Sequence, residues 1–156
     1  MKILVLGLGN ELISDDGLGI FAARALEEKL EGKADVVESS LHGVALMELF
    51  IGYDKAVVID AIQTGEHPPG TILELTPSDL DPVLAPSPHY SGLPEFLALA
   101  KRLELDFPSE LRILAMEVTD TVTWGGEMTQ PVGEALPEFV QRVERLVMEW
   151  TEVQDR

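Results

Sequence analysis

Two spacings of apolar residues alternate along the chain, and the shorter spacing marks strands. Residues 2–6 form a β-branched and leucine-rich run that stops at Gly7, which is typical of a strand buried on both faces. Residues 55–60 repeat this pattern with alanine, valine and isoleucine. Shorter or alternating runs predict three further strands, at residues 35–39, 71–75 and 111–116.

Helical spacing fills most of the intervals between these strands. Residues 17–30 carry apolar side chains three and four positions apart, beginning with Leu18 and Phe21. Asp15 and Asp16 precede this helix, and either carboxylate is a candidate cap for its first turn. The same spacing predicts helices at residues 44–50, 92–103 and 132–150.

Strands that alternate with helices predict an α/β fold. We expect a single-domain three-layer sandwich over residues 1–156, with a mostly parallel five-stranded sheet and helices on both faces. One connection differs, because a Pro68-Pro69-Gly70 turn and no helix joins residues 55–60 to residues 71–75. These two strands are therefore expected to run antiparallel or to lie far apart. The proline-rich residues 80–88 predict a loop.

Charge and composition narrow the classes of partner. The chain has 28 acidic and 11 basic residues, for a formal net charge of −17. An electrostatic field of this sign repels phosphate backbones, so we expect no nucleic-acid partner. The negative charge also keeps the protein soluble, and it attracts a cation or a basic peptide. No apolar run approaches the roughly 18 to 20 residues that a membrane helix needs, and the opening residues resemble a strand rather than a secretion signal. We therefore expect a cytoplasmic protein without a membrane partner.

The absence of cysteine removes several kinds of chemistry. The sequence contains none, which excludes disulfides, thiolate metal ligands and a cysteine nucleophile. It also contains no Gly-x-Ser-x-Gly turn and no His-Glu-x-x-His helix, so serine hydrolases and ordinary zinc proteases are disfavoured.

Three polar residues follow elements whose ends should meet. Asp16 follows the first strand, Asp60 ends the third, and His89 lies just before the third long helix. In open α/β sheets, ligands collect outside the carboxyl ends of the strands, so chain direction alone sends all three toward one edge. Two carboxylates and one imidazole suit Zn²⁺ or Ni²⁺ with coordination positions left open.

Each of these residues also has an ordinary interpretation. Asp16 could cap a helix, Asp60 could be a hydrogen-bonded structural carboxylate, and His89 could be an exposed loop residue. His42 is a weaker candidate at the start of the second helix, and His67 beside the Pro68-Pro69 turn is expected to be solvated.

The glycines after the first strand invite a dinucleotide-binding interpretation, which the neighbouring residues oppose. Gly7-Leu8-Gly9-Asn10 is followed by Leu12 where the fingerprint needs a small residue. Glu38 could imitate the ribose-binding acid, but Asp15 and Asp16 occupy the helix start that would receive the phosphates. We therefore expect no nucleotide cofactor.

The order of these motifs resembles the hydrogenase maturation endopeptidase family. The most specific block is residues 3–10 (ILVLGLGN) followed by residues 15–19 (DDGLG). Residues 59–61 (IDA), residues 87–89 (SPH) with Gly92-Leu93, and residues 128–132 (MTQPV) resemble later blocks in matching order.

The resemblance implies a function and a ligand set. Members are α/β sandwiches that remove a short C-terminal extension from the large-subunit precursor of [NiFe]-hydrogenase after nickel has been inserted. The family's metal ligands fall on Asp16, Asp60 and His89 of this sequence, and the nickel they recognise belongs to the substrate. Asp16 or Asp60 is also a candidate base for activating water, and sequence does not choose between them or polarisation by the metal.

One loop departs from the family pattern. Many members carry Asp-Gly-Gly-Thr after the second strand, where this chain has Leu41-His42-Gly43-Val44. We associate this change with substrate choice and name His42 and Gly43 as candidate substrate-binding residues. Two alternatives to the protease stay open: a non-catalytic, nickel-dependent checkpoint or chaperone protein for the same precursor, and a general metallohydrolase with its own zinc.

Overall fold

The computed structural model describes residues 1–80 and 93–155. It contains all five predicted strands: β1 (Ile3–Leu8), β2 (Asp35–Ser39), β3 (Lys55–Ile62), β4 (Ile72–Leu75) and β5 (Glu110–Glu117). The strands β1 and β3 both extend two residues beyond their predicted ends. The predicted loop at residues 80–88 lies outside the described residues, apart from Leu80.

The predicted helices are present with altered ends. α1 (Leu18–Glu27) follows a 3-10 turn, η1 (Ser14–Gly17), and the predicted helix at residues 44–50 consists of η2 (Gly43–Leu46) and α2 (Met47–Phe50). The other two predicted helices correspond to α3 (Leu93–Arg102) and α4 (Gln130–Gln154), whereas η3 (Pro77–Asp79) was not predicted. The predicted capping of α1 by Asp15 or Asp16 is wrong. Gly17 is the N-cap residue, and within the described part of the chain no side chain caps that end.

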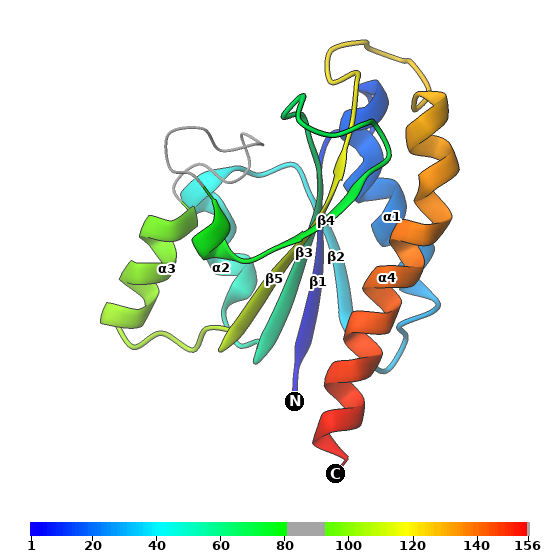
Figure 1. The fold of residues 1–156 in the computed structure, drawn as a ribbon. Helices are drawn as coiled ribbons and strands as arrows, with labels where there is room; N and C mark the ends of the chain where they lie inside the picture. Colours follow the sequence, from blue (N-terminus) through cyan, green and yellow to red (C-terminus); the bar gives the residue numbers. More distant parts are fainter. Residues whose placement is uncertain (81–92, 156) are drawn as a thin grey trace.

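The sheet is mostly parallel, with strand order β2-β1-β3-β5-β4. β1, β2, β3 and β5 run parallel, whereas β4 pairs with β5 in the antiparallel sense. β5 lies between β3 and β4, and β4 runs antiparallel to β3, which is one of the two alternatives expected for a connection without a helix. Figure 1 views this sheet with β4 in front. In this view the carboxyl ends of the parallel strands lie at the upper edge of the sheet.

Helices cover both faces of the sheet and enclose two apolar cores. α1 and α4 cover one face (Figure 1), and Leu18, Val143 and Val57 belong to the apolar core on that face. α2 and α3 cover the other, where the rings of Phe50 and Phe96 have centroids 6.1 Å apart. Continuous apolar runs such as that of β1 are explained by this arrangement, because every side chain of a central strand is buried.

The start of α1 approaches the sheet more closely than a side chain would allow. A Cβ atom on Gly19 would lie 2.2 Å from the carbonyl oxygen of Leu8 and 2.6 Å from that of Ile59. These are backbone atoms of β1 and β3, which cannot move aside independently. Gly19 therefore sets the helix against the carboxyl ends of the two central strands.

Substitution at this contact should destabilise the fold. We expect Gly19→Ala to lower the free energy of unfolding by about 1–3 kcal/mol, because the added methyl overpacks against fixed backbone. Urea denaturation measures the change. Gly133→Ala is the control, since a Cβ there meets no atom within 4 Å and Gly133 lies inside α4. Equal stability of Gly19→Ala and the wild type would contradict the close approach.

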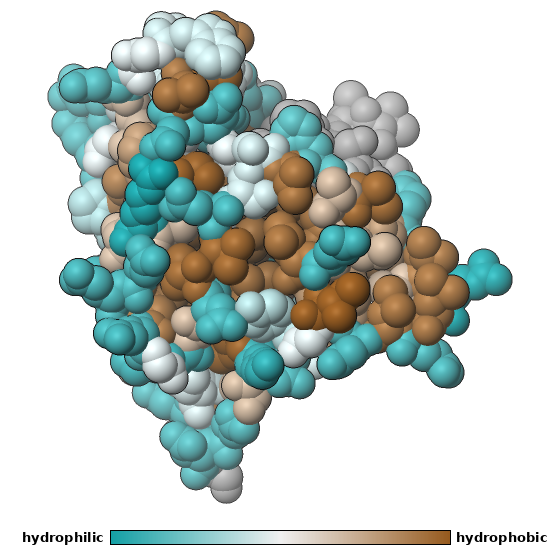
Figure 2. All heavy atoms as spheres, turned by 180° about the vertical axis from the view of Figure 1, so that it is seen from behind, coloured by the Kyte–Doolittle hydropathy of each residue, from teal (hydrophilic) through white to brown (hydrophobic). Residues whose placement is uncertain are grey.

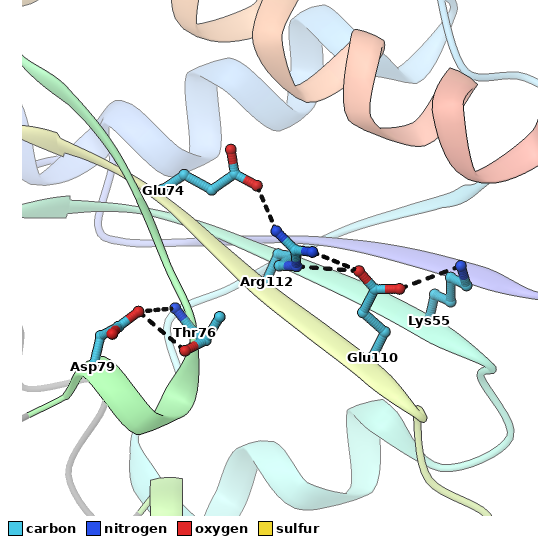
Figure 3. A network of polar contacts seen from close by, with 6 residues as sticks. All are labelled: Lys55, Glu74, Thr76, Asp79, Glu110 and Arg112. Atoms are coloured by element: carbon cyan, nitrogen blue, oxygen red, sulfur yellow. Dashed lines mark hydrogen bonds and ion pairs between the residues drawn. The ribbon is translucent and has the colours of Figure 1, made fainter.

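An ion-pair network crosses three strands near the opposite end of β3 and β5 (Figure 3). Arg112 pairs with Glu74 of β4 at 2.9 Å and with Glu110 at 3.0 Å, and Lys55 pairs with Glu110 at 3.3 Å. Burial would raise the pKa of Glu110, but the hydrogen bond and charge of Lys55 and the charge of Arg112 together lower it. Lys55 and Glu110 begin their strands, so this network supports the sheet and lies apart from its carboxyl edge.

Apolar surface gathers on the back of the molecule, between the helices of the two layers (Figure 2). The strand β2 forms the edge of the sheet on this side. Exposed apolar residues just after β2 include Leu41 and Val44, and Ile51 follows α2. Among the helices described, none has the length and apolar character needed to span a membrane.

Candidate active site at the carboxyl edge of the sheet

Asp60 is a buried carboxylate inside β3. It pairs in register with Ala115 of β5, and its side chain has no exposed surface. Its Oδ1 atom accepts a hydrogen bond from the backbone N–H of Ala61 at 2.8 Å. The prediction that Asp60 ends the strand is wrong by two residues, because Ala61 and Ile62 continue the pairing with β5. A carboxylate buried among apolar strand residues costs free energy, which favours a role beyond packing.

Asp16 lies on η1, directly after the loop that follows β1, and is partly buried. The backbone N–H of Asn10 donates to Asp16 Oδ2 at 3.1 Å and to the Asp16 carbonyl oxygen at 3.2 Å. Gly9 makes this possible, since it has φ +149° and a Cβ there would lie 2.1 Å from the same carbonyl oxygen. The loop after β1 therefore folds back on Asp16 and holds its carboxylate.

The packing of α1 brings these two carboxylates to one edge of the sheet. Gly19, three residues after Asp16, lies close to the carbonyl oxygens of Leu8 and Ile59. Ile59 directly precedes Asp60. Asp16 and Asp60 therefore meet the expectation from chain direction. His89, the third predicted ligand, lies outside the described residues. Within residues 1–80 and 93–155, no three histidine or carboxylate side chains are close enough to hold a metal ion.

Asp15 has a role that sequence reasoning missed. Its carboxylate is fully buried and accepts hydrogen bonds from the backbone N–H groups of Thr119 at 3.1 Å, Asp120 at 3.0 Å and Thr129 at 2.7 Å. The hydroxyl of Thr129 also lies within 3.0 Å of both carboxylate oxygens. Local pattern suggested a helix cap, but the partners are more than a hundred residues away along the chain.

Glu117 is a third buried carboxylate, and the sequence pattern did not identify it as a candidate site residue. It ends β5 with 1% of its surface exposed and accepts hydrogen bonds from the backbone N–H of Thr64, at 2.8 Å, and from the Thr64 hydroxyl. Register pairs Glu117 with Ile62, two residues beyond Asp60, so alternation places both carboxylates on the same face of the sheet. A charged residue directly after the apolar run at residues 111–116 was the sequence feature that could have identified it.

The altered loop after β2 lies at the same edge of the sheet. His42 is exposed and precedes η2, and Gly43 is buried with φ +55°. The flanking side chains of Leu41 and Val44 are 45% and 64% exposed. The loop therefore presents an imidazole between two apolar side chains, which suits contact with another molecule.

An open polar cleft of about 270 Å³ is lined by Asn10, Glu11 and Glu38 among others, and Asn10 connects it to Asp16 through a hydrogen bond. Arg24 pairs with Glu11 at 2.6 Å and with Glu38 at 2.9 Å. The hydrogen bond and charge of Arg24 hold the pKa of Glu11 below its ordinary value. Glu38, the residue considered as a ribose-binding acid, is thus engaged by Arg24. A cleft this open, bordered by backbone and charged groups, suits an extended peptide.

The arrangement supports two kinds of chemistry. Asp16 and Asp60 offer carboxylate oxygens that can bind a divalent cation or accept a proton from water. The assignment of Asp16, Asp60 and His89 as the metal-recognition set stays a prediction. The substrate-contact roles of His42 and Gly43 also stay predictions.

Solved structures similar to this one include maturation endopeptidases. The hydrogenase maturating endopeptidase HybD from Escherichia coli superimposes with a TM-score of 0.74 at 27% identity, covering 96% of this chain and 93% of that one. The [NiFe] hydrogenase maturation protease HybD from Thermococcus kodakarensis gives a TM-score of 0.73 at 28% identity, covering 94% of this chain and 99% of that one. The fold is therefore the single-domain α/β sandwich of these endopeptidases.

Sequence comparison agrees with the fold. The hydrogenase 2 maturation protease of E. coli strain K12 is 30% identical over 120 residues, covering 74% of this chain and 73% of that protein. The hydrogenase expression/formation protein HupD of Rhizobium leguminosarum bv. viciae is 28% identical over 154 residues, covering 96% of this chain and 75% of that protein. Residues 20–146 match the profile of the hydrogenase maturation protease family. The chain belongs to this family and is an enzyme of the protease class.

Proposed function

We propose that this enzyme removes the C-terminal extension of a nickel-loaded [NiFe]-hydrogenase large-subunit precursor. The observation that carries the proposal is the pair Asp16 and Asp60 at one sheet edge, beside an open cleft, in a chain of the maturation protease family. Asp16, Asp60 and His89 would recognise the nickel that the precursor carries. We propose the cytoplasm as its compartment, on the premise that the precursor is made and processed there.

The surface properties support a folded protein as substrate. Apolar surface beside charged surface is typical of protein-binding sites, and the back of the molecule has such surface (Figure 2). Leu41 and Val44, in the loop after β2, are also exposed. The net charge of −17 favours a partner with a basic docking surface.

Incubation with nickel-loaded precursor tests the proposal directly. Mass measurement of the product should show loss of one C-terminal peptide from the large subunit. A stable complex without cleavage would favour the checkpoint or chaperone alternative. Tightly bound zinc in the purified enzyme, with hydrolysis of unrelated peptides, would favour a general metallohydrolase.

The loop after β2 should determine which precursor is accepted. We expect His42→Gly to change the relative cleavage rates of precursors from different hydrogenases, because an exposed imidazole is lost from a surface next to the site. Rates measured on several nickel-loaded precursors provide the readout. His67→Gly is the matched control, since His67 is exposed in the connection between β3 and β4. Unchanged rates for His42→Gly across all precursors would make His42 an ordinary surface residue.

A further inference from the structure

The short turn that carries Asp16 is held by residues far away along the chain as well as by its own loop, in which the N–H of Asp16 donates to the carbonyl of Ile13 at 2.9 Å. Ser14, its first residue, has φ +29°, an unfavourable value for a residue with a side chain, and is buried. Within the described residues η1 has no side-chain cap. Strained backbone of this kind persists only where surrounding structure over-determines it. The contacts that hold this turn therefore decide where Asp16 lies.

Those contacts converge on Asp15 and on the segment between β5 and α4. The backbone N–H of Asp15 donates to the carbonyl of Asp120 at 2.9 Å, while its carboxylate accepts N–H groups from both ends of the segment, at Thr119 and Thr129. Ser14 Oγ donates to the carbonyl oxygen of Glu127 at 3.0 Å. A β-bridge between Ile13 and Trp124 adds one further link.

The carboxylate also anchors the start of the longest helix. Thr129 is the N-cap residue of α4, and its N–H lies 2.7 Å from Asp15 Oδ1. A negative charge is favourable at this position, because the helix dipole is positive at its N-terminus. Hydrogen bonds to an ionised acceptor are stronger than those between neutral groups. Asp15 thus joins the turn, the segment at residues 119–129 and α4 through one buried group.

We propose that Asp15 is a positioning residue of the active site, which fixes the carboxylate of Asp16 by fastening its strained turn to residues 119–129 and the start of α4. This inference rests on the proposed proteolytic function for its kinetic consequence. Loss of the fastening lets Ser14 relax toward ordinary backbone angles, and Asp16 shifts with it. The cleavage step suffers, whereas docking of the large precursor surface elsewhere does not.

The first test separates positioning from stability. Asp15→Asn keeps the size of the side chain but replaces one carboxylate oxygen by an NH₂ group. This group is a donor and cannot accept the backbone N–H groups that the oxygen accepted. We expect kcat for nickel-loaded precursor to fall about 100-fold with little change in KM, because misplacement near 1 Å has an effect of this size. Val147→Ala, in the buried face of α4, is the control for lost stability. At a temperature where circular dichroism shows both variants folded, it should retain wild-type kcat.

Two conservative substitutions of Thr129, the hydrogen-bond partner of Asp15, test whether its hydroxyl group is needed. Thr129→Val removes the hydroxyl that contacts Asp15 and retains the backbone N–H, whereas Thr129→Ser retains both. We expect kcat to fall for Thr129→Val and to return for Thr129→Ser. Equal kcat for these two variants, or equal kcat for Asp15→Asn and Val147→Ala, would overturn the proposal.

Fluorescence gives a readout that needs no proteolysis. The chain has two tryptophans; Trp150 is buried, while Trp124 lies in the fastened segment with 68% of its surface exposed. In a Trp150→Phe background, Asp15→Asn should lower the steady-state anisotropy of Trp124, and Asp16→Asn should leave it unchanged. Unchanged anisotropy in Asp15→Asn would overturn the fastening. An inactive wild type with the expected anisotropy change would instead contradict the proposed function alone.

Discussion

Asp16→Asn is expected to fold normally and to release the C-terminal tail of nickel-loaded precursor at least about 100-fold more slowly than the wild type. Even residues that only hydrogen-bond to a metal ligand change metal affinity or activity by about 10 to 100-fold, and Asp16 is proposed as a ligand itself. The substitution keeps the size of the side chain. Its amide oxygen can still accept the N–H of Asn10, which lies 3.1 Å from Asp16 Oδ2. The change is therefore confined to the charge that a cation or a reacting proton requires.

Asp60→Asn should have a similar effect on the rate but a different effect on stability. Asp60 is fully buried, whereas Asp16 is partly exposed. A substitution at a fully buried site changes the hydrogen bonding of its surroundings, so we expect Asp60→Asn to alter the unfolding temperature more than Asp16→Asn does. Thermal unfolding and cleavage assays on both variants provide the comparison.

Asp35→Asn is the matched control for these two variants. Asp35 begins β2, at the end of the strand away from the site, and its exposed carboxylate accepts a hydrogen bond from the hydroxyl of Tyr53 at 2.8 Å. We expect wild-type cleavage for this variant. Wild-type rates from Asp16→Asn would instead remove Asp16 from the site, and the same result for Asp60→Asn would make that residue structural.

Most of the fold could be predicted because its central strands have a simple pattern. β1 and β3 are buried on both faces, so most of their residues are apolar, and their short runs of β-branched residues end at Gly7 and at Asp60. The connection without a helix left two possibilities for β4, antiparallel to β3 or far from it, and the pairing with β5 makes it antiparallel. The end of β3 was harder to predict, because Ala61 and Ile62 belong to the strand only through pairing with β5.

The candidate site could be predicted only in part, for a physical reason. Asp16 and Asp60 follow from chain direction, since the carboxyl ends of parallel strands share an edge. Asp15 could not be assigned in this way, because its hydrogen bond to Thr129 spans 114 positions along the chain. A local pattern favours the nearest available backbone donors, and here distant donors satisfy the carboxylate instead.

The nickel of the precursor should act as a gate for proteolysis. The chain has no cysteine, and nickel prefers sites with nitrogen and sulfur donors over carboxylates alone. The residues we assign to recognition, Asp16, Asp60 and His89, would therefore hold the ion weakly by themselves. A precursor that has received nickel would bring the ion already bound to its own ligands, and the enzyme would complete the coordination shell.

This arrangement would place the scissile bond in one geometry. Fixing a reacting group against its catalyst removes an entropic part of the barrier that reaches roughly 7 to 11 kcal/mol in the best-oriented cases. A precursor without nickel lacks the anchor, so its C-terminal tail meets the carboxylates in many orientations. We expect nickel-free precursor to survive under conditions in which loaded precursor is cleaved.

The gate is tested by comparing tail release from nickel-free and nickel-loaded precursor at equal enzyme concentration. His89→Ala should slow cleavage of the loaded form, because an imidazole ligand is lost, while His67→Ala should not. Adding nickel salt to enzyme and nickel-free precursor should not restore cleavage, because the ion must sit in the precursor's own site. Equal cleavage of both precursors would contradict gating and favour a hydrolase that carries its own metal. Cleavage of the nickel-loaded precursor and not of the nickel-free one would mean that the enzyme hydrolyses the peptide bond only after nickel has been inserted.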